Sequence, residues 1–189
     1  MPDVITYSAV ISAHEKAGDA RGASYWFKHL LANGPLFITS NQPDGVVPDV
    51  ITYNAVISAH EKAGDGQASA LLDSAIERGV LWFSLGFDPE HNLLDLHEPA
   101  VVIHPPTADR PRGISSDLAK VIFRRLADLG TINRQTTFVV GRHGTDRLKE
   151  AIAQCMRVRG WTPVHPRDAD GTENEGCWVA KPDAPDRSS

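Results

Sequence analysis

The hydrophobic positions in the first half of the chain form one pattern that occurs twice. Residues 2–19 read PDVITYSAVISAHEKAGD, residues 48–65 read PDVITYNAVISAHEKAGD, and the two segments differ only at Ser8 and Asn54. The second copy has the i, i+3, i+4, i+7 spacing of one helix face, at Tyr53, Val56, Ile57 and His60. The pattern therefore predicts the same helix at two places in the chain.

Each predicted helix has a start signal, an end signal and a partner helix. Asp49 or Thr52 can cap the start of the second copy, and Gly64 can end it. A further helical segment follows each copy, at 20–34 and at 66–79, and each segment ends at a glycine. The repeated unit is therefore predicted to be a pair of helices. Such pairs bury their apolar faces only by stacking on neighbours.

Beyond about residue 80 the pattern changes, because short apolar runs now alternate with helical segments. Strands are predicted at 93–97, 136–140, 162–165 and 177–181, and helices at 114–130 and 145–160. Strands that alternate with helices of this length predict a small α/β sandwich. The expected organisation is a helical solenoid over 1–82, an α/β domain over 91–181 and a polar tail over 182–189.

Composition excludes several classes of protein. No apolar run approaches the roughly eighteen residues of a membrane-spanning helix. The first 20 residues contain Asp3, no arginine and no basic segment, so no targeting segment is expected there. The two cysteines, Cys155 and Cys177, form neither a CxxC motif nor a Cys/His cluster at zinc spacing. We therefore expect no metal site and no cofactor.

Charge is divided unevenly along the chain. The net charge is −5, but residues 1–90 carry 5 basic and 11 acidic residues, whereas residues 110–159 carry 11 basic and 4 acidic residues. A local basic patch can contact phosphate whatever the overall charge. Scattered surface arginines on two helices are the alternative interpretation.

The duplicated segment resembles the pentatricopeptide repeat family in its Pro-Asp start, its Thr-Tyr pair, its apolar triplet and its Lys-Ala-Gly turn. The resemblance implies a solenoid over about residues 2–82 that binds single-stranded RNA, each repeat reading one base with two or three side chains. The matching positions are Ser8 and Asn54, directly after Thr-Tyr, and Asp49 at the end of a repeat. Ordinary polar residues of a first helical turn are the alternative.

The second half resembles the Smr (small MutS-related) domain over about residues 91–181. LDLH at 94–97 is similar to its opening strand, VVGRHG at 139–144 to its central glycine turn, and NEGCWVAK at 174–181 to its closing strand. The chain departs from the family at Glu98, where a glycine is usual, and in its Pro-rich insert. The resemblance implies nucleic-acid binding, nicking by some members, and a location in chloroplasts or mitochondria.

The glycine turn is a candidate phosphate site. Gly141 and Gly144 allow a tight turn at the end of a strand, and the helix that follows presents unpaired N–H groups and the positive end of its dipole. Arg142 and Arg147 can add charge-assisted contacts to phosphate oxygens. A plain connection between strand and helix is the alternative.

Candidate catalytic residues lie on the opening strand and in the glycine turn. Asp95 and His97 are two residues apart, so their side chains face the same side of a strand. A carboxylate can orient an imidazole, which then acts as general acid or base in phosphodiester cleavage. His143 is the second candidate acid. A structural pair that bonds loop backbone is the alternative.

Three functional hypotheses stay open. The first is an RNA-binding protein of organelle RNA metabolism whose α/β domain acts as an endoribonuclease or nicking endonuclease, with Mg²⁺ compatible with the cleavage. The second is the same protein without catalysis, as a processing or translation factor, and the third is a degenerate fragment. The expected partner is single-stranded RNA, with DNA as the alternative, and no membrane. The oligomeric state stays open.

Overall fold

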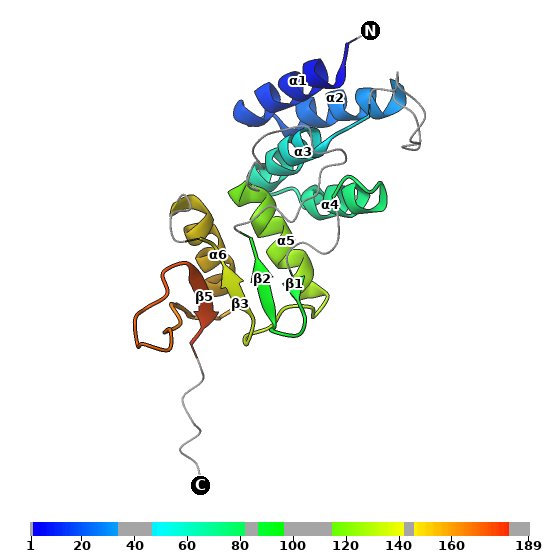
Figure 1. Cartoon of the computed structure of the whole chain (residues 1–189). Helices are drawn as coiled ribbons and strands as arrows, with labels where there is room; N and C mark the ends of the chain where they lie inside the picture. The colour runs from blue at the N-terminus through cyan, green and yellow to red at the C-terminus, as the bar shows by residue number, and fades with distance from the viewer. Residues whose placement is uncertain (1, 34–46, 82–86, 97–114, 142–145, 182–189) are drawn as a thin grey trace.

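The structure of the chain is a computed structural model that describes residues 2–33, 47–81, 87–96, 115–141 and 146–181 (Figure 1). Two helical hairpins form the N-terminal part, and a small mixed sheet with two helices forms the C-terminal part. Both parts of the predicted fold class are therefore present. No helix in the described ranges is long and apolar enough to cross a membrane.

The hairpins consist of α1 (Val4–Lys16) with α2 (Ala20–Asn33), and of α3 (Val50–Ala63) with α4 (Gln67–Glu77). Asp49 caps α3, because its carboxylate accepts from the backbone N–H of Thr52 at 2.8 Å. Asp3 caps α1 in the same way through Thr6. Gly64 ends α3 with φ 65°, in the left-handed region that favours glycine. The predicted helix pairs are confirmed, as are the cap at Asp49 and the end at Gly64, whereas the glycine predicted to end the segment 20–34 lies outside the described residues.

Helix α3 is enclosed, whereas its near-identical copy α1 is not. α1 packs on one side of α3 and α5 (Ser116–Asp128) packs on another (Figure 1). Phe27 of α2 meets Tyr53 of α3 edge to face, with ring centroids 4.9 Å apart. As a result Ala59 is 1% exposed, while the equivalent Ala13 in α1 is exposed. Position in the stack, and not sequence, sets the burial of the repeated helix.

The C-terminal part contains β1 (Phe87–Asp88), β2 (Leu93–Asp95), β3 (Thr137–Val139), β4 (Pro163–Val164), β5 (Cys177–Ala180), α5 and α6 (Asp146–Val158). The sheet order is β1-β2-β3-β5-β4. Strands β2 and β3 are parallel, and the other pairs are antiparallel. The four predicted strands are present in shorter form. Strand β1 was not predicted, because two residues show no alternating pattern.

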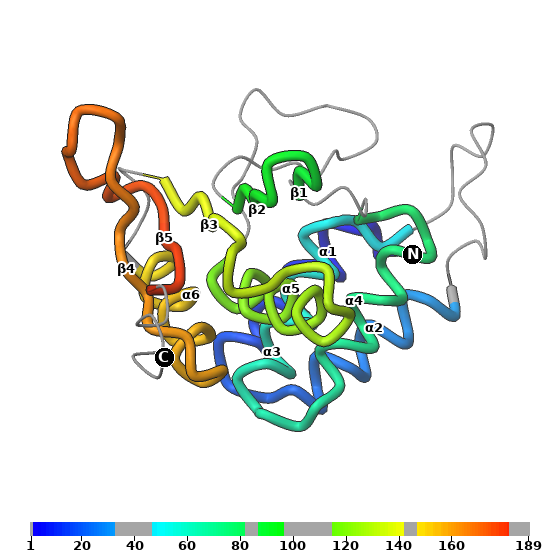
Figure 2. The backbone as a smooth tube through the Cα atoms, turned by 90° about the horizontal axis from the view of Figure 1, so that it is seen from below, coloured from blue at the N-terminus to red at the C-terminus, as the bar shows by residue number. Residues whose placement is uncertain are grey.

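Helices α5 and α6 lie side by side on one face of the sheet (Figure 2). Leu94 of β2 and Phe138 of β3 are fully buried, and the Phe138 ring lies 5.1 Å from that of Phe123 in α5. The strand residues on either side of Leu94 and Phe138 are only half-buried. The alternation is that of a sheet with one face packed on helices, as the sequence predicted.

Ion pairs fasten α5 to the second hairpin. The guanidinium of Arg124 makes two hydrogen bonds to the carboxylate of Glu61 in α3. Arg125 Nε donates to Asp73 of α4 at 3.0 Å. The hydrophobic core is also continuous from the hairpins through α5 to the sheet. The α/β unit is therefore packed directly on the last repeat.

Candidate nucleic-acid interface

Two polar side chains occupy the same place in the first helices of the two hairpins. Ser8 and Asn54 each lie five residues after the capping aspartate of their helix. The side chain of each residue contacts the start of another helix: Ser8 contacts α3, and Asn54 contacts α5. Ser8 Oγ lies 2.7 Å from Thr52 Oγ1 at the start of α3, and Ser115 Oγ, at the start of α5, donates to Asn54 Oδ1 at 2.7 Å. The residues that differ between the two copies therefore lie at the junctions between consecutive modules.

At the Ser8 junction the hydrogen bonds run in one direction, with Ser8 donating to Thr52 and Thr52 donating to Asp49. The Asp49 carboxylate can only accept, and it accepts from the Thr52 hydroxyl at 2.7 Å. Because this uses the single hydroxyl proton of Thr52, Ser8 must donate its own proton to Thr52. Ser8 is 6% exposed and keeps only acceptor capacity toward a ligand. The structure thus brings Ser8 and Asp49 together, through a threonine that sequence reasoning had considered only as a cap.

The Asn54 junction is more open and has the opposite polarity. Asn54 is half-buried, and its amide oxygen is occupied by the Ser115 hydroxyl. Among the residues that the structure describes, none accepts from the amide nitrogen of Asn54. Asn54 can therefore donate two N–H bonds to a ligand. Of the three residues proposed to read bases, it is the one best placed for direct contact.

Two isoleucines complete this surface and were missed in the sequence. Ile5 and Ile51 are the second residues of α1 and α3, and they are 74% and 43% exposed. Each lies three residues before Ser8 or Asn54, and residues three apart share a helix face. A base that reaches Asn54 would lie against the apolar side chain of Ile51. The available signal was a large apolar residue outside the buried stripe, at the same position in both copies.

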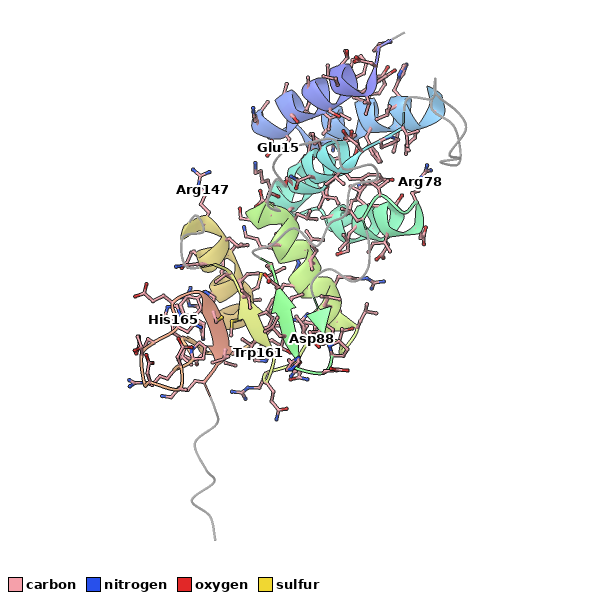
Figure 3. All side chains as sticks on the ribbon, in the orientation of Figure 1. Glu15, Arg78, Asp88, Arg147, Trp161 and His165 are labelled. Atoms are coloured by element: carbon pink, nitrogen blue, oxygen red, sulfur yellow. The ribbon has the colours of Figure 1, made fainter. Side chains whose placement is uncertain are left out.

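The α/β candidates that the structure describes lie at one edge of the sheet. Asp95 ends β2 and is paired in register with Val139, which ends β3. Gly141 follows two residues later with φ 79°, and its N–H donates to the Gly176 carbonyl at 3.1 Å. Arg147 is exposed at the start of α6, at the end of that helix nearer the repeats (Figure 3). Asp95 and Gly141 therefore share the carboxyl edge of the parallel strands.

The remaining site predictions lie outside the described residues. They are His97 and His143, proposed as acid or base, and Arg142 and Gly144, proposed to contact phosphate.

Most basic residues of the segment 110–159 that the structure describes form ion pairs within the protein. Arg124 and Arg125 bond acidic residues of the second hairpin. On the outer surface of the α/β unit, Arg157 pairs with Glu150 at 2.8 Å, and Arg159 pairs with Asp128. Much of the positive charge thus holds the α/β unit together and onto the repeats. Only part of it is free to contact phosphate.

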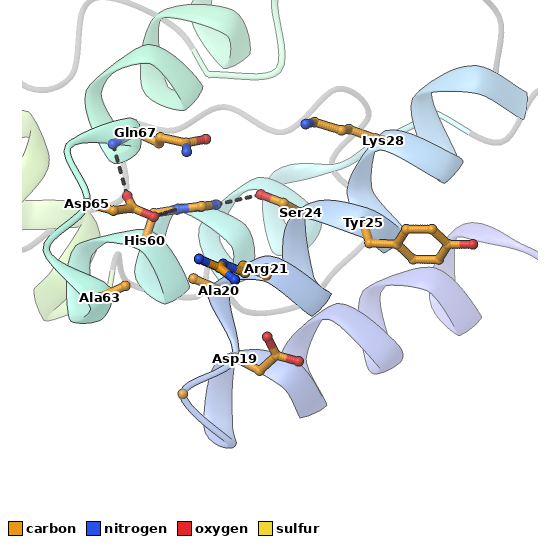
Figure 4. Close-up of a pocket in the computed structure, with 11 residues that line it drawn as sticks. Asp19, Ala20, Arg21, Ser24, Tyr25, Lys28, His60, Ala63, Asp65 and Gln67 are labelled. Atoms are coloured by element: carbon orange, nitrogen blue, oxygen red, sulfur yellow. Dashed lines mark hydrogen bonds and ion pairs between the residues drawn. The ribbon is translucent and has the colours of Figure 1, made fainter.

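A second group of polar residues bridges the two hairpins at a pocket of about 730 Å³ (Figure 4). His60 is 2% exposed. Its Nε2 lies 2.5 Å from Ser24 Oγ of α2, and its Nδ1 lies 2.6 Å from Asp65 Oδ2. Partial burial acts to raise the pKa of Asp65, but hydrogen bonds from the Gln67 N–H and from His60 outweigh it. The net effect lowers the Asp65 pKa below 3.8.

The order serine, histidine, aspartate is that of a nucleophilic triad, but the first repeat supplies a simpler reason for it. His14 and Asp19 form the same pair at 2.9 Å across the same turn, without a serine in the place of Ser24. The pair is thus a component of the repeated turn. We interpret Ser24 as the contact by which one repeat holds the next.

Comparison with known proteins agrees with the repeats. Residues 5–35 and 51–79 match the family model of the PPR (pentatricopeptide) repeat. No match to the Smr domain was found. No curated protein matches the chain. The N-terminal part therefore carries two PPR repeats, a repeat type with an RNA-binding role.

Proposed function

We propose that the two PPR repeats bind single-stranded RNA along the first helices of the stack, and that Asn54 makes the main base contact. The observation that carries this proposal is the placement of Asn54. It is partly exposed, its amide nitrogen has no described partner, and it shares a helix face with the exposed Ile51. An amide donor beside an exposed apolar side chain can hydrogen-bond an unpaired base and also pack against its face.

Ser8 and Asp49 form the second, weaker contact of this proposal. Ser8 donates to Thr52 and Thr52 donates to Asp49, so both Ser8 and Asp49 can only accept from a ligand, and Ser8 is nearly buried. The first 90 residues are acidic overall, so few phosphate contacts support the binding. We expect modest affinity with a shallow dependence on salt, because each phosphate that is neutralised steepens that dependence.

The test is binding of a labelled single-stranded RNA pool, measured by fluorescence anisotropy at several salt concentrations. Replacing Asn54 with alanine is expected to weaken binding about tenfold, since hydrogen bonds to a base edge contribute about 1–3 kcal/mol. Gln135→Ala is the matched control, because it removes an exposed side-chain amide that lies in the α/β unit, just before β3 begins. Equal losses in the two variants would refute a specific role for Asn54.

Cleavage by the α/β unit is the second candidate function. It is supported by the resemblance to the Smr domain and by the shared strand edge of Asp95 and Gly141. In this proposal Asp95 orients His97, His143 is the alternative acid, and Arg142, Gly144 and Arg147 contact phosphate. In the competing proposal the same residues bind nucleic acid without cleaving it.

Incubation with labelled single-stranded RNA and DNA, with Mg²⁺ or with a chelator, separates these proposals. Cleavage that is lost in Asp95→Asn, His97→Ala and Arg142→Ala supports the nuclease. Binding without any cleavage supports the non-catalytic module. The resemblance also leads us to propose a chloroplast or mitochondrial location, which fluorescence microscopy of a tagged full-length protein would test.

A further inference from the structure

The pocket between the two hairpins lies away from the proposed base contacts. It is lined by the turn from α1 to α2, by α2 itself and by residues around the turn from α3 to α4 (Figure 4). His60 bonds Ser24 of α2, whereas Asn54 bonds Ser115 of α5. The pocket and Asn54 are therefore on different sides of α3. The volume of about 730 Å³ falls within the roughly 300–1,000 Å³ that small-molecule sites occupy.

One face of α2 presents two cations to this pocket. Arg21 and Lys28 line it and are exposed, and Tyr25 lies between them, four residues after one and three before the other, on the same helix face. Among the residues that the structure describes, neither cation has a hydrogen bond or an ion pair. In the view of Figure 4 the two cations lie on opposite sides of the hydrogen bond between Ser24 and His60. Both charges are therefore available to an anion in the pocket.

The two carboxylates of the pocket already have partners. Asp19 accepts from a backbone N–H at 2.8 Å with one oxygen, and its other oxygen lies 2.9 Å from His14 Nδ1. Asp65 divides its oxygens in the same way, between a backbone N–H at 3.1 Å and His60 at 2.6 Å. The negative charge is thus held at the two turns, and the cations of α2 stay unpaired.

The rest of the pocket offers an acceptor and an aromatic ring. The ionised Asp65 can only accept, so a neutral His60 donates to it through Nδ1 and accepts the Ser24 proton at Nε2. Ser24 Oγ then has only acceptor capacity toward a ligand, which suits a hydroxyl group. Tyr25 is 62% exposed, and its ring can stack on a planar base. Cations, an acceptor and a ring match the phosphate, the ribose and the base of a nucleotide.

The second hairpin lacks this set of residues. The positions that follow Arg21, Tyr25 and Lys28 by 46 residues are Gln67, Leu71 and Ser74. They provide neither a cation nor an aromatic ring. The set therefore belongs to the first hairpin alone and is not a component of the repeated turn.

We propose that this pocket binds a nucleoside monophosphate. Arg21 and Lys28 hold its phosphate, Ser24 accepts from a ribose hydroxyl, and the base stacks on Tyr25. A free nucleotide and the 5′-terminal nucleotide of an RNA strand carry this same chemistry. The site does not depend on the RNA contact proposed for Asn54.

The experiment is isothermal titration calorimetry of the full chain with adenosine monophosphate (AMP), adenosine and inorganic phosphate. We expect AMP to bind with a Kd of about 10–100 μM, from the binding free energy per atom that is typical of ligands of this size. Adenosine and phosphate should each bind at least about tenfold more weakly, since each lacks part of the contacts. Absence of AMP binding at about 1 mM, or equal affinity for phosphate alone, would overturn the proposal.

Surface variants locate the binding. Arg21→Gln, Lys28→Gln and Tyr25→Ala should each weaken AMP binding about tenfold, because each removes one charge-assisted or stacking contact. Lys16→Gln is the matched control, since it removes an exposed cation at the end of α1 that does not line the pocket. Equal losses in Lys16→Gln and Arg21→Gln would assign the binding to overall charge and overturn the site. Asn54→Ala should leave the Kd for AMP unchanged, so the proposed function can fail without this inference.

Two short RNAs that differ only at the 5′ end identify the source of the nucleotide. Displacement of AMP by the 5′-phosphorylated RNA, but not by the 5′-hydroxyl RNA, assigns the pocket to the end of a strand. AMP binding that neither RNA displaces assigns it to a free nucleotide. Equal displacement by both RNAs would show that phosphates within a strand fill the pocket, and would overturn the assignment to a monophosphate.

Discussion

Replacing His60 with alanine should destabilise the protein far more than the same change at His14, although both residues lie in identical sequence. The two histidines pair with an aspartate five residues later, at 2.9 Å for His14 and 2.6 Å for His60. They differ in their surroundings. The side chain of His60 is 3% exposed and that of His14 is 32% exposed. Only His60 also bonds Ser24 of the preceding hairpin.

The magnitude follows from what each truncation removes. His60→Ala loses two hydrogen bonds of about 1 kcal/mol each and leaves a void between the hairpins that costs about 1 kcal/mol more. The expected loss is about 3 kcal/mol. His14→Ala removes one partly exposed pair, for which about 0.5 kcal/mol is expected.

Urea unfolding followed by circular dichroism at pH 7 measures both losses on the same scale. Ser24→Ala is the intermediate case and should cost about 1 kcal/mol, because it removes one of the two bonds. Equal losses for His60→Ala and His14→Ala would refute the assignment of His60 as the contact between repeats.

Three further outcomes are expected. Hydrogen bonds lower the Asp65 pKa below 3.8, so its contribution to stability should be present above about pH 4 and lost as pH falls further. Urea midpoints at pH 3 and pH 6 should then differ less in Asp65→Asn than in the unaltered protein. A double-mutant cycle on Glu61 and Arg124, whose side chains are 11% and 42% exposed, should give a coupling energy of about 1 kcal/mol, and no coupling would argue against docking through this pair. Burial raises the pKa of the Cys155 thiol, so iodoacetamide should alkylate it slowly at neutral pH until urea unfolds the chain; rapid alkylation of the folded protein would contradict that burial.

Local signals made the repeats and most strands predictable. The helix-face spacing of Tyr53, Val56 and Ile57 coincides with side chains that are fully buried. The capping choice at Asp49 and the glycine end at Gly64 are also local, because each depends on bonds within three or four residues. Such features do not depend on tertiary contacts, so the sequence alone can predict them.

The junctions were not predictable, because they join residues far apart in the chain. Ser115 and Asn54 are 61 residues apart, and no pattern in either segment indicates the other. The sequence leaves open whether the basic stretch is a phosphate patch or a set of scattered surface arginines, and in the structure Arg124 and Arg125 pair with acids of the second hairpin. Charge along a sequence shows where cations are concentrated. Only the packing of α5 on α3 and α4 shows which of them are already neutralised.

The packing of α5 also explains how a stack of two PPR repeats can end. In a stack of helix pairs each unit buries its face against the next, so the last unit needs a cover. Here α5 supplies one. Ser115 at its start bonds Asn54, and Arg124 two turns later bonds Glu61, so the contact follows α3 for most of its length. The first helix of the α/β unit thereby takes the place that α3 occupies beside α1.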